Sequence, residues 1–153
     1  YVISGATTPV ARFTIGAGAE VNCITDNLTG LMWVKDLNTV IINGAVAGAM
    51  RNWQNALNSI ATANSGSGYC GHKDWYLPTV NDLTSLVNYG YVGSQSTWLN
   101  AQGFSNVQGF SYWSSTSRTR SSSAAWGVRF FDGYVDSLEK TGTLNIWPVR
   151  SGQ

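Results

Sequence analysis

A chain of 153 residues has the length of one domain with its own hydrophobic core. Charged residues make up only 11% of it, well below the roughly 25% of average soluble domains, and nine Lys and Arg against eight Asp and Glu leave a net charge of +1. This balance argues against nucleic acid as a partner, and the absence of any run of about 18 apolar residues argues against a membrane-spanning helix.

The first third of the chain predicts short strands around turns. Residues 1–11 lack periodicity and are expected to form an arm or linker, which leaves a single domain over residues 12–153. No signal peptide is visible, and because the chain begins mid-sequence in character, we expect it to be one domain of a longer protein. Residues 40–50 carry no charge and no clear period, and are either a packed loop or short hairpin, or a subunit contact. Apolar runs and turn signals predict three strands, at 12–15, 21–25 and 31–34.

Two helices are predicted in the middle of the chain. The first covers residues 51–63. Its apolar residues recur at the spacing of one helix face: Trp53, Ala56, Leu57, Ile60 and Ala61. The second covers residues 80–89 and follows Pro78, which disfavours helical geometry in the residue before it. Thr79 and Asp82 have the spacing of a capping box, so we expect the second helix to begin directly after Thr79.

The C-terminal third is expected to be β-structure, after a loop-rich stretch over residues 91–109. Four strands are predicted, at 112–116, 124–131, 134–140 and 144–150, with a polar loop over 117–123. Alternation in the second of these strands places Trp126, Val128 and Phe130 on one face. The Asp132-Gly133 pair that follows is a strong hairpin signal.

Cys23 and Cys70 are the only cysteines, and they lie far apart in the sequence. With a single His in the chain, they do not form the pattern of a zinc site. The neutral, polar composition is common in secreted or cell-surface modules, where cysteines pair. We therefore expect a Cys23–Cys70 disulfide, which contributes roughly 3–4 kcal/mol in the chain-entropy model, with two buried free thiols as the alternative.

An ordered series of short blocks supports a family resemblance. The blocks are Asp26–Trp33, Asp74–Thr79, Tyr112–Thr116, Ala125–Phe130 and Trp147–Arg150. Each block is weak alone, but five in this order form a specific signal over roughly residues 20–150. The series resembles the C-terminal domain family of the Legionella collagen-like adhesin. Tyr76 and Trp147 depart from the pattern, since many relatives carry Arg at both positions.

This resemblance implies an α+β fold of the C-type lectin-like kind, with two helices packed on a curled antiparallel sheet. The elements predicted above follow the same order of strand, helix, helix and sheet. The first strand, near residues 12–15, is then expected beside the last strand, near residues 146–150. The family also implies a homotrimer that follows a collagen-like stalk at the bacterial cell surface. Its member binds sulfated glycosaminoglycans and supports host-cell attachment and biofilm formation.

Catalysis is not expected from the residues present. An enzyme needs a nucleophile with a base, or a poised acid–base pair, and His72 is the only imidazole. We interpret His72 as a loop or packing residue, with anion contact as the alternative. Asp132, Asp136 and Glu139 lie together in a predicted hairpin, but the Pro-flanked signature of calcium-dependent lectins is absent. We therefore expect no metal site and no cofactor, with calcium as the alternative.

Sulfate recognition needs Arg or Lys side chains placed together, and Arg suits it best because its donors form a fixed fork. Arg118 and Arg120, beside the hydroxyl groups of residues 121–123, form the best local cluster, with chance arginines on a solvated loop as the alternative. Lys73 and His72 form a second pair on another loop. Weaker candidates are Arg51, Lys35 and Lys140.

The sequence therefore predicts a non-enzymatic adhesin head, extracellular or on the bacterial surface, that binds sulfated polysaccharides of the heparin, heparan sulfate or chondroitin sulfate class. Exposed charges are screened over about 8 Å in physiological salt, so one Arg pair binds weakly. A homotrimer presents three pairs to one polymer, and linked sites raise avidity by roughly 10²–10⁴. Two other functions stay open: a structural tip or assembly module with a protein partner, and a lectin that stacks neutral sugars on exposed Trp or Tyr.

Overall fold

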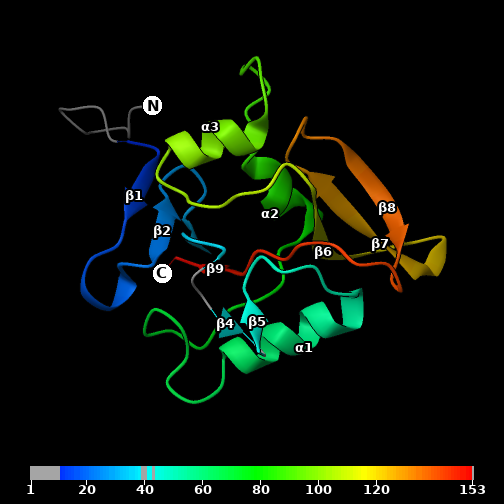
Figure 1. Ribbon diagram of the computed structural model, residues 1–153, viewed down its shortest axis with the longest axis horizontal. Coiled ribbons are helices and arrows are strands. Elements are labelled where there is room, and N and C mark those ends of the chain that lie inside the picture. The colour runs from blue at the N-terminus through cyan, green and yellow to red at the C-terminus, as the bar shows by residue number, and fades with distance from the viewer. Residues whose placement is uncertain (1–10, 39–40, 43, 153) are drawn as a thin grey trace.

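Two main antiparallel sheets and three α-helices organise the computed structural model, which describes residues 11–38, 41–42 and 44–152 (Figure 1). The first sheet has the order β1-β2-β3-β9, formed by β1 (Phe13–Ile15), β2 (Cys23–Asp26), β3 (Leu31–Val34) and β9 (Val149–Ser151). The second has the order β6-β7-β8, formed by β6 (Ser111–Arg118), β7 (Ser121–Arg129) and β8 (Val135–Glu139). The α+β class is confirmed, whereas the arm expected over residues 1–11 lies, except for Ala11, outside the described residues.

The strand order of the first sheet corrects one expectation. The first strand does not lie beside the last, because β1 pairs with β2 and β9 pairs with β3, at opposite edges of the sheet. The cause is the turn over residues 26–30, where Gly30 adopts φ +75° and folds β3 directly back on β2. This tight hairpin takes the two central positions and leaves one edge to β1 and the other to β9.

The C-terminal segment over residues 144–149 is buried and connects the two sheets. Its isolated bridges join Leu144 to Arg51, Asn145 to Tyr112 and Val149 to Tyr76. Because its partner changes along its length, the strand expected over residues 144–150 is regular only at Val149–Ser151. In Figure 1 the same segment runs from the β6-β7-β8 sheet to the β1-β2-β3-β9 sheet.

Aromatic rings fill the core around this segment. Trp147 is fully buried, and its ring centroid lies 5.2–5.6 Å from those of four others: Trp33, Phe104, Tyr112 and Phe130. Its Nε1 donates to the Val34 carbonyl oxygen at 2.8 Å, so the polar atom of the buried ring is satisfied. Position 147 is therefore a core position in this chain.

Both predicted helices are present with shorter bounds. Helix α1 (Trp53–Ala63) is capped by Asn52, which accepts from the Asn55 N–H at 2.8 Å, and it begins after Arg51 because Arg51 bridges to the C-terminal segment. Helix α2 (Val80–Ser85) has the predicted capping box between Thr79 and Asp82. It ends at Ser85 instead of residue 89.

Helix α3 (Gln95–Ala101) replaces part of the loop-rich stretch expected over residues 91–109. Two of its three buried residues, Gln95 and Ser96, are polar, so its buried face carries little apolar periodicity. The Gln95 side chain both accepts from the Asn88 N–H at 2.7 Å and donates to the Asn88 carbonyl oxygen at 3.1 Å. These bonds hold the chain between α2 and α3 out of helical geometry.

The uncharged stretch over residues 40–50 forms a short hairpin of β4 (Ile41–Ile42) and β5 (Ala45–Val46), in agreement with one of its two interpretations. Residues 40 and 43 lie outside the described residues. Beyond the hairpin, the chain packs closely on the core, since a Cβ added to Gly48 would lie 2.8 Å from the Cβ of Leu37. The alternative of a subunit contact stays a prediction.

Candidate functional site

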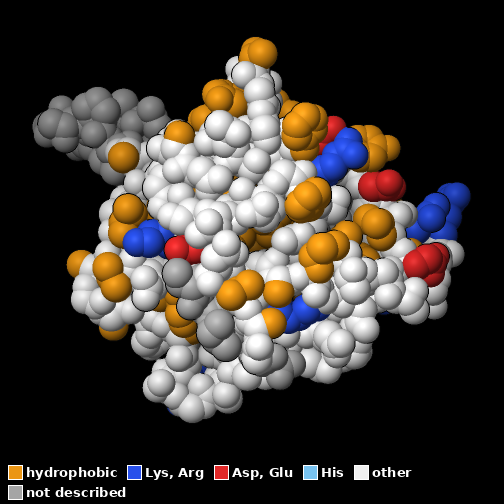
Figure 2. Space-filling view, in the orientation of Figure 1, with side chains coloured by type: hydrophobic (Ala, Val, Ile, Leu, Met, Phe, Trp, Pro, Cys, Tyr) orange, Lys and Arg blue, Asp and Glu red, His pale blue; other side chains and the backbone are white. Residues whose placement is uncertain are grey.

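Charged side chains are sparse on the surface, and several arginines are already paired. Figure 2 shows a face that is mostly white and orange, with few blue and red groups. The described ion pairs of arginine join Arg12 to Asp26, Arg129 to Asp132 and Arg150 to Asp74. Each pair offsets the charge of its guanidinium group. A basic binding site must therefore come from other cations.

Arg51 is not a surface cation, contrary to the prediction. The residue is 8% exposed, and its guanidinium group donates to main-chain carbonyl oxygens of the preceding segment, those of Ala45, Val46, Ala47 and Ala49. Burial lowers the pKa of Arg51. The surrounding carbonyl oxygens satisfy the buried donors and hold the chain between β5 and α1 in place, so its role is structural.

Arg118 and Arg120 stand at the tip of the β6–β7 hairpin. The polar stretch over residues 117–123 is not the loop expected, since β6 runs to Arg118 and β7 begins at Ser121, opposite it. Both arginines are exposed, and within the described residues neither side chain has a hydrogen-bond or ion-pair partner. A blue group stands at the right-hand edge of Figure 2, where this hairpin projects in Figure 1. The tip therefore presents two guanidinium groups to solvent.

Lys140 lies at the same end of the sheet, directly after β8. Its Nζ donates to Ser117 Oγ at 2.9 Å and stands 3.9 Å from the centroid of the Trp53 ring. Its N–H donates to the Ser123 carbonyl oxygen at 2.8 Å, which ties it to the start of β7. We call Arg118, Arg120 and Lys140 the basic cluster.

Glu139 limits the charge of the basic cluster. It is exposed and directly precedes Lys140, and in the β7–β8 ladder it lies opposite Ala124. Three cations beside one carboxylate leave a local charge of +2 at this end of the sheet. The cluster is therefore cationic, although the whole chain carries only +1.

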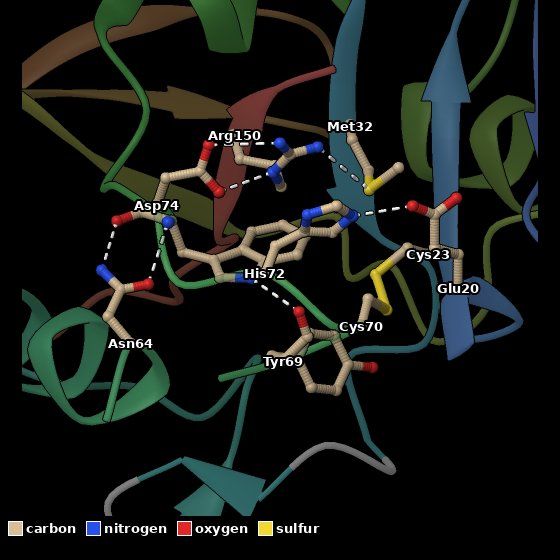
Figure 3. Close-up of polar contacts among 10 residues, drawn as sticks. Glu20, Cys23, Met32, Asn64, Tyr69, Cys70, His72, Asp74 and Arg150 are labelled. Carbon is tan, nitrogen blue, oxygen red and sulfur yellow. Dashed lines mark hydrogen bonds and ion pairs between the residues drawn. A yellow bond between two sulfur atoms is a disulfide. The ribbon is translucent and has the colours of Figure 1, made fainter. Parts of the chain in front are cut away.

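The second predicted pair, His72 and Lys73, lies elsewhere, on the loop after Cys70, which the disulfide ties to β2. Figure 3 shows His72 and this disulfide. The Nε2 of His72 is 2.7 Å from Oε1 of Glu20, which belongs to the short 3-10 helix η1 (Gly18–Glu20). This contact supports the interpretation of His72 as a packing residue, because its Nε2 is engaged by Glu20 within the fold. Lys73 is exposed, and in the part of the chain that is described no hydrogen bond or ion pair joins it to the basic cluster.

The expected Cys23–Cys70 disulfide is present, and both residues are buried. It closes a sequence separation of 47 residues, which corresponds to about 4 kcal/mol in the chain-entropy model. Asp74, four positions after Cys70, accepts from Arg150 at 2.7 and 3.2 Å, as Figure 3 shows. This hydrogen bond lowers the pKa of the Asp74 carboxyl. Disulfide and ion pair together fasten the loop over residues 70–74 to the first sheet.

The family model of the Lcl C-terminal domain matches residues 22–150. The chain belongs to this family. The resemblance drawn from the five sequence blocks is therefore confirmed, since all five lie inside the matched range. A comparison with curated proteins finds no match.

Within this Lcl C-terminal domain, two of the three carboxylates considered for calcium have hydrogen-bond partners, whereas Glu139 is exposed at the end of β8. Asp132 accepts from the Arg129 side chain and from the Tyr134 N–H, and Asp136 accepts from the Ser137 N–H. In the described ranges, no group of three His, Cys, Asp or Glu side chains is arranged to hold a metal ion. Among the same residues, none of the helices combines the length and apolar character that crossing a membrane requires.

Two contacts of the candidate residues, those of His72 with Glu20 and of Lys140 with Trp53, could not be predicted from the sequence. Glu20 lies 52 residues from His72, and the Trp53 ring beneath Lys140 belongs to a different third of the chain. Neither residue carries a local signal, because the contacts depend on how η1 and α1 pack. Lys140 was a weak candidate for the same reason, since only the β-sheet brings it to Ser117, the neighbour of Arg118 in β6.

Proposed function

We propose that this Lcl C-terminal domain is a non-enzymatic adhesin head that binds sulfated polysaccharides through the basic cluster. The supporting observation is the tip of the β6–β7 hairpin, where Arg118 and Arg120 are exposed and have no carboxylate partner among the described residues. The ligand class is heparin, heparan sulfate or chondroitin sulfate. Membership of the family supports a place at the bacterial surface or outside the cell, and a part in host-cell attachment and biofilm formation.

The chemistry of the hairpin suits a sulfate group. A guanidinium group offers a planar fork of donors that matches two sulfate oxygens, and its charge is retained at any physiological pH. Ser121 and Ser123, whose hydroxyl oxygens lie 3.0 Å apart at the start of β7, add neutral donors beside the arginines. Lys140 is held in position over Trp53, so part of its ordering is complete before a ligand binds.

A single basic cluster binds weakly, which favours an assembly. The two arginines of the cluster are exposed, and screening in physiological salt limits each contact to about 8 Å. Three copies in a homotrimer raise avidity by roughly 10²–10⁴ when one polymer reaches more than one cluster. We also infer the C-type lectin-like variant of the α+β class, supported by β9, which returns to the sheet of the N-terminal strands after the second sheet is complete.

Heparin-affinity chromatography with a salt gradient tests the proposal. The wild-type chain is compared with Arg118→Ala/Arg120→Ala and with Lys35→Ala/Lys73→Ala, which loses the same charge from other surfaces. We expect the hairpin variant to elute at clearly lower salt, because it lacks both forks, whereas the second variant elutes close to the wild type.

Two controls accompany the chromatography. Circular dichroism shows whether each variant keeps the wild-type fold, as expected for exposed side chains. Arg118→Lys/Arg120→Lys keeps the charge but loses the forks, and should elute between the hairpin variant and the wild type. Equal retention of the hairpin variant and the wild type would contradict the assigned site.

A further inference from the structure

Trp53 begins α1 beside the basic cluster and is bonded to both sides of the second sheet. Its Nε1 donates to the Ser114 carbonyl oxygen of β6 at 2.9 Å, and its main-chain N–H donates to the Lys140 carbonyl oxygen, directly after β8, at 3.1 Å. The register of β6 against β7 shifts between Trp113 and Ser117, so Ser114 lies in an irregular part of the strand. Figure 1 shows the start of α1 beside the end of β8. Trp53 is therefore fixed to the two outer strands of the sheet.

The side chain of Lys140 lies on this fixed ring. Its Nζ is 3.9 Å from the centroid of the Trp53 ring and donates to Ser117 Oγ at 2.9 Å. The negative face of an aromatic ring attracts an ammonium group and favours this position for it. An ammonium group has three N–H donors, and Ser117 takes one of them. Lys140 is therefore held in place and keeps donors for an oxygen of a ligand.

An aromatic ring holds a cation without neutralising its charge. Two other cations lie over rings, Arg12 and Arg129, but each also pairs with a carboxylate, that of Asp26 or Asp132. Within the described ranges no ion pair joins Lys140 to a carboxylate. A carboxylate would fix the ammonium group and offset its charge at the same time. The ring fixes it and leaves the full positive charge for a ligand.

The three cations of the basic cluster therefore differ in how much order they have before a ligand binds. The side chains of Arg118 and Arg120 are exposed, and no described residue accepts from them, so they lose rotamer freedom when they bind. Lys140 is half-buried and already held by Trp53 and Ser117, so it loses less. The cluster combines one cation that is placed in advance with two that adapt to the ligand.

We infer that Trp53 is a positioning residue of the polysaccharide site, whose ring holds the Lys140 ammonium group where an anionic oxygen of the polymer reaches it. The inference rests on the proposed function, because it concerns the same basic cluster. Lys140 covers the face of the ring, so Trp53 acts through the lysine and not by stacking on a sugar. Removing the ring should therefore lower the affinity for the polymer while the charge of the cluster stays the same.

The salt dependence of heparin binding tests this inference. Dissociation constants are measured at several salt concentrations for the wild type, Trp53→Leu and Lys140→Ala. The slope of affinity against salt, both as logarithms, reports how many cations displace counterions from a linear polyanion. Lys140→Ala should bind more weakly and with a shallower slope. Trp53→Leu should bind about two- to fivefold more weakly with the slope of the wild type, because the lysine keeps its charge but loses its support.

A double-mutant cycle separates positioning from a general effect on the fold. In the Lys140→Ala background, Trp53→Leu should have no further effect on heparin affinity, since no ammonium group is left to position. Trp53→Phe should bind more tightly than Trp53→Leu. Both variants lose the Nε1 donor, so their difference isolates the ring. A Trp53→Leu effect that is undiminished in the Lys140→Ala background would overturn the inference.

Trp98 provides a matched control, because it is also half-buried and lies 5.8 Å from the guanidinium carbon of Arg12, away from the cluster. Trp98→Leu should keep the wild-type affinity for heparin. A second measurement needs no substitution at Trp53: in the wild type, the nuclear magnetic resonance signal of the Trp53 Nε1–H should shift on titration with heparin, and that of Trp98 should not. A Trp53 signal that stays in place at saturating heparin would overturn the inference even if Trp53→Leu does not fold.

The same measurements separate this inference from the proposed function. A wild type that does not bind heparin overturns the proposed function and, with it, the role of Trp53. A wild type that binds, is weakened by Arg118→Ala/Arg120→Ala and is unaffected by Trp53→Leu overturns only the role of Trp53. Weakening by Trp53→Leu and Lys140→Ala, but not by the arginine variant, supports the role of Trp53 and overturns that of the two arginines.

Discussion

The burial and the hydrogen-bond partners of each arginine in this domain depend on the groups around it. Arg51 is buried among carbonyl oxygens, and Arg150, with 5% of its side chain exposed, bonds Asp74. Arg118 and Arg120 have the same chemistry but stand at the end of β6 and in the turn that follows it, where no carboxylate of the described residues reaches them. The functional difference between these arginines therefore comes from position and not from residue type.

The Asp74–Arg150 pair makes a prediction about stability and pH. Asp74→Asn removes the carboxylate from a buried guanidinium group and should lower the free energy of unfolding by about 1–2 kcal/mol at pH 7. Arg150 lowers the pKa of Asp74 below its ordinary value of 3.8. The stabilisation is therefore complete above that value and is lost as pH falls through the lowered folded-state pKa.

Urea unfolding of the wild type and Asp74→Asn between pH 7 and pH 2 checks this prediction. The difference between the two proteins should shrink at acid pH, where Asp74 of the wild type becomes protonated. Asp132→Asn is the matched control, because its pair with Arg129 is exposed on both sides and should contribute less. A difference that is the same at every pH would contradict the assigned role of Asp74.

At the scale of elements, the sequence predicted those strands and helix ends that are determined by residues close together in the chain. The strand over residues 31–34 and the capping box of α2 depend on neighbouring residues, and both were predicted correctly. Helix α3 was missed because its buried residues include Gln95 and Ser96, whose burial depends on bonds to Asn88 and the β7–β8 turn. The sequence alone contains no sign of these partners.

The capping box makes the prediction at this scale. Thr79→Ala removes the oxygen that accepts from the Asp82 N–H and should lower the free energy of unfolding by about 1 kcal/mol. Thr62→Ala, on the exposed face of α1, is the matched control and should change it little, because Ala is favoured inside helices. Thermal unfolding of both variants provides the comparison. An equal loss in the two variants would mean that the cap does not stabilise α2.

At the scale of the whole molecule, the domain separates two surfaces of different chemistry along one sheet. The basic cluster lies at the β6–β7 tip, and four exposed rings lie towards the β7–β8 turn at the opposite end of β7, those of Tyr89, Phe110, Phe131 and Tyr134. The sequence indicated the arginines and the family, but not the grouping of Lys140 with them or of four distant rings. Such groupings depend on strand register and on loop packing, which no local pattern records.

The central claim is that the guanidinium groups of Arg118 and Arg120 contact sulfate. The most direct test measures the dissociation constants of wild type and Arg118→Ala/Arg120→Ala for heparin and for desulfated heparin, at one salt concentration. We predict that desulfation weakens the binding of the wild type by about tenfold or more. The binding of the variant should weaken much less, because it lacks the guanidinium groups that contact the sulfate. Equal weakening of both proteins by desulfation would contradict the claim.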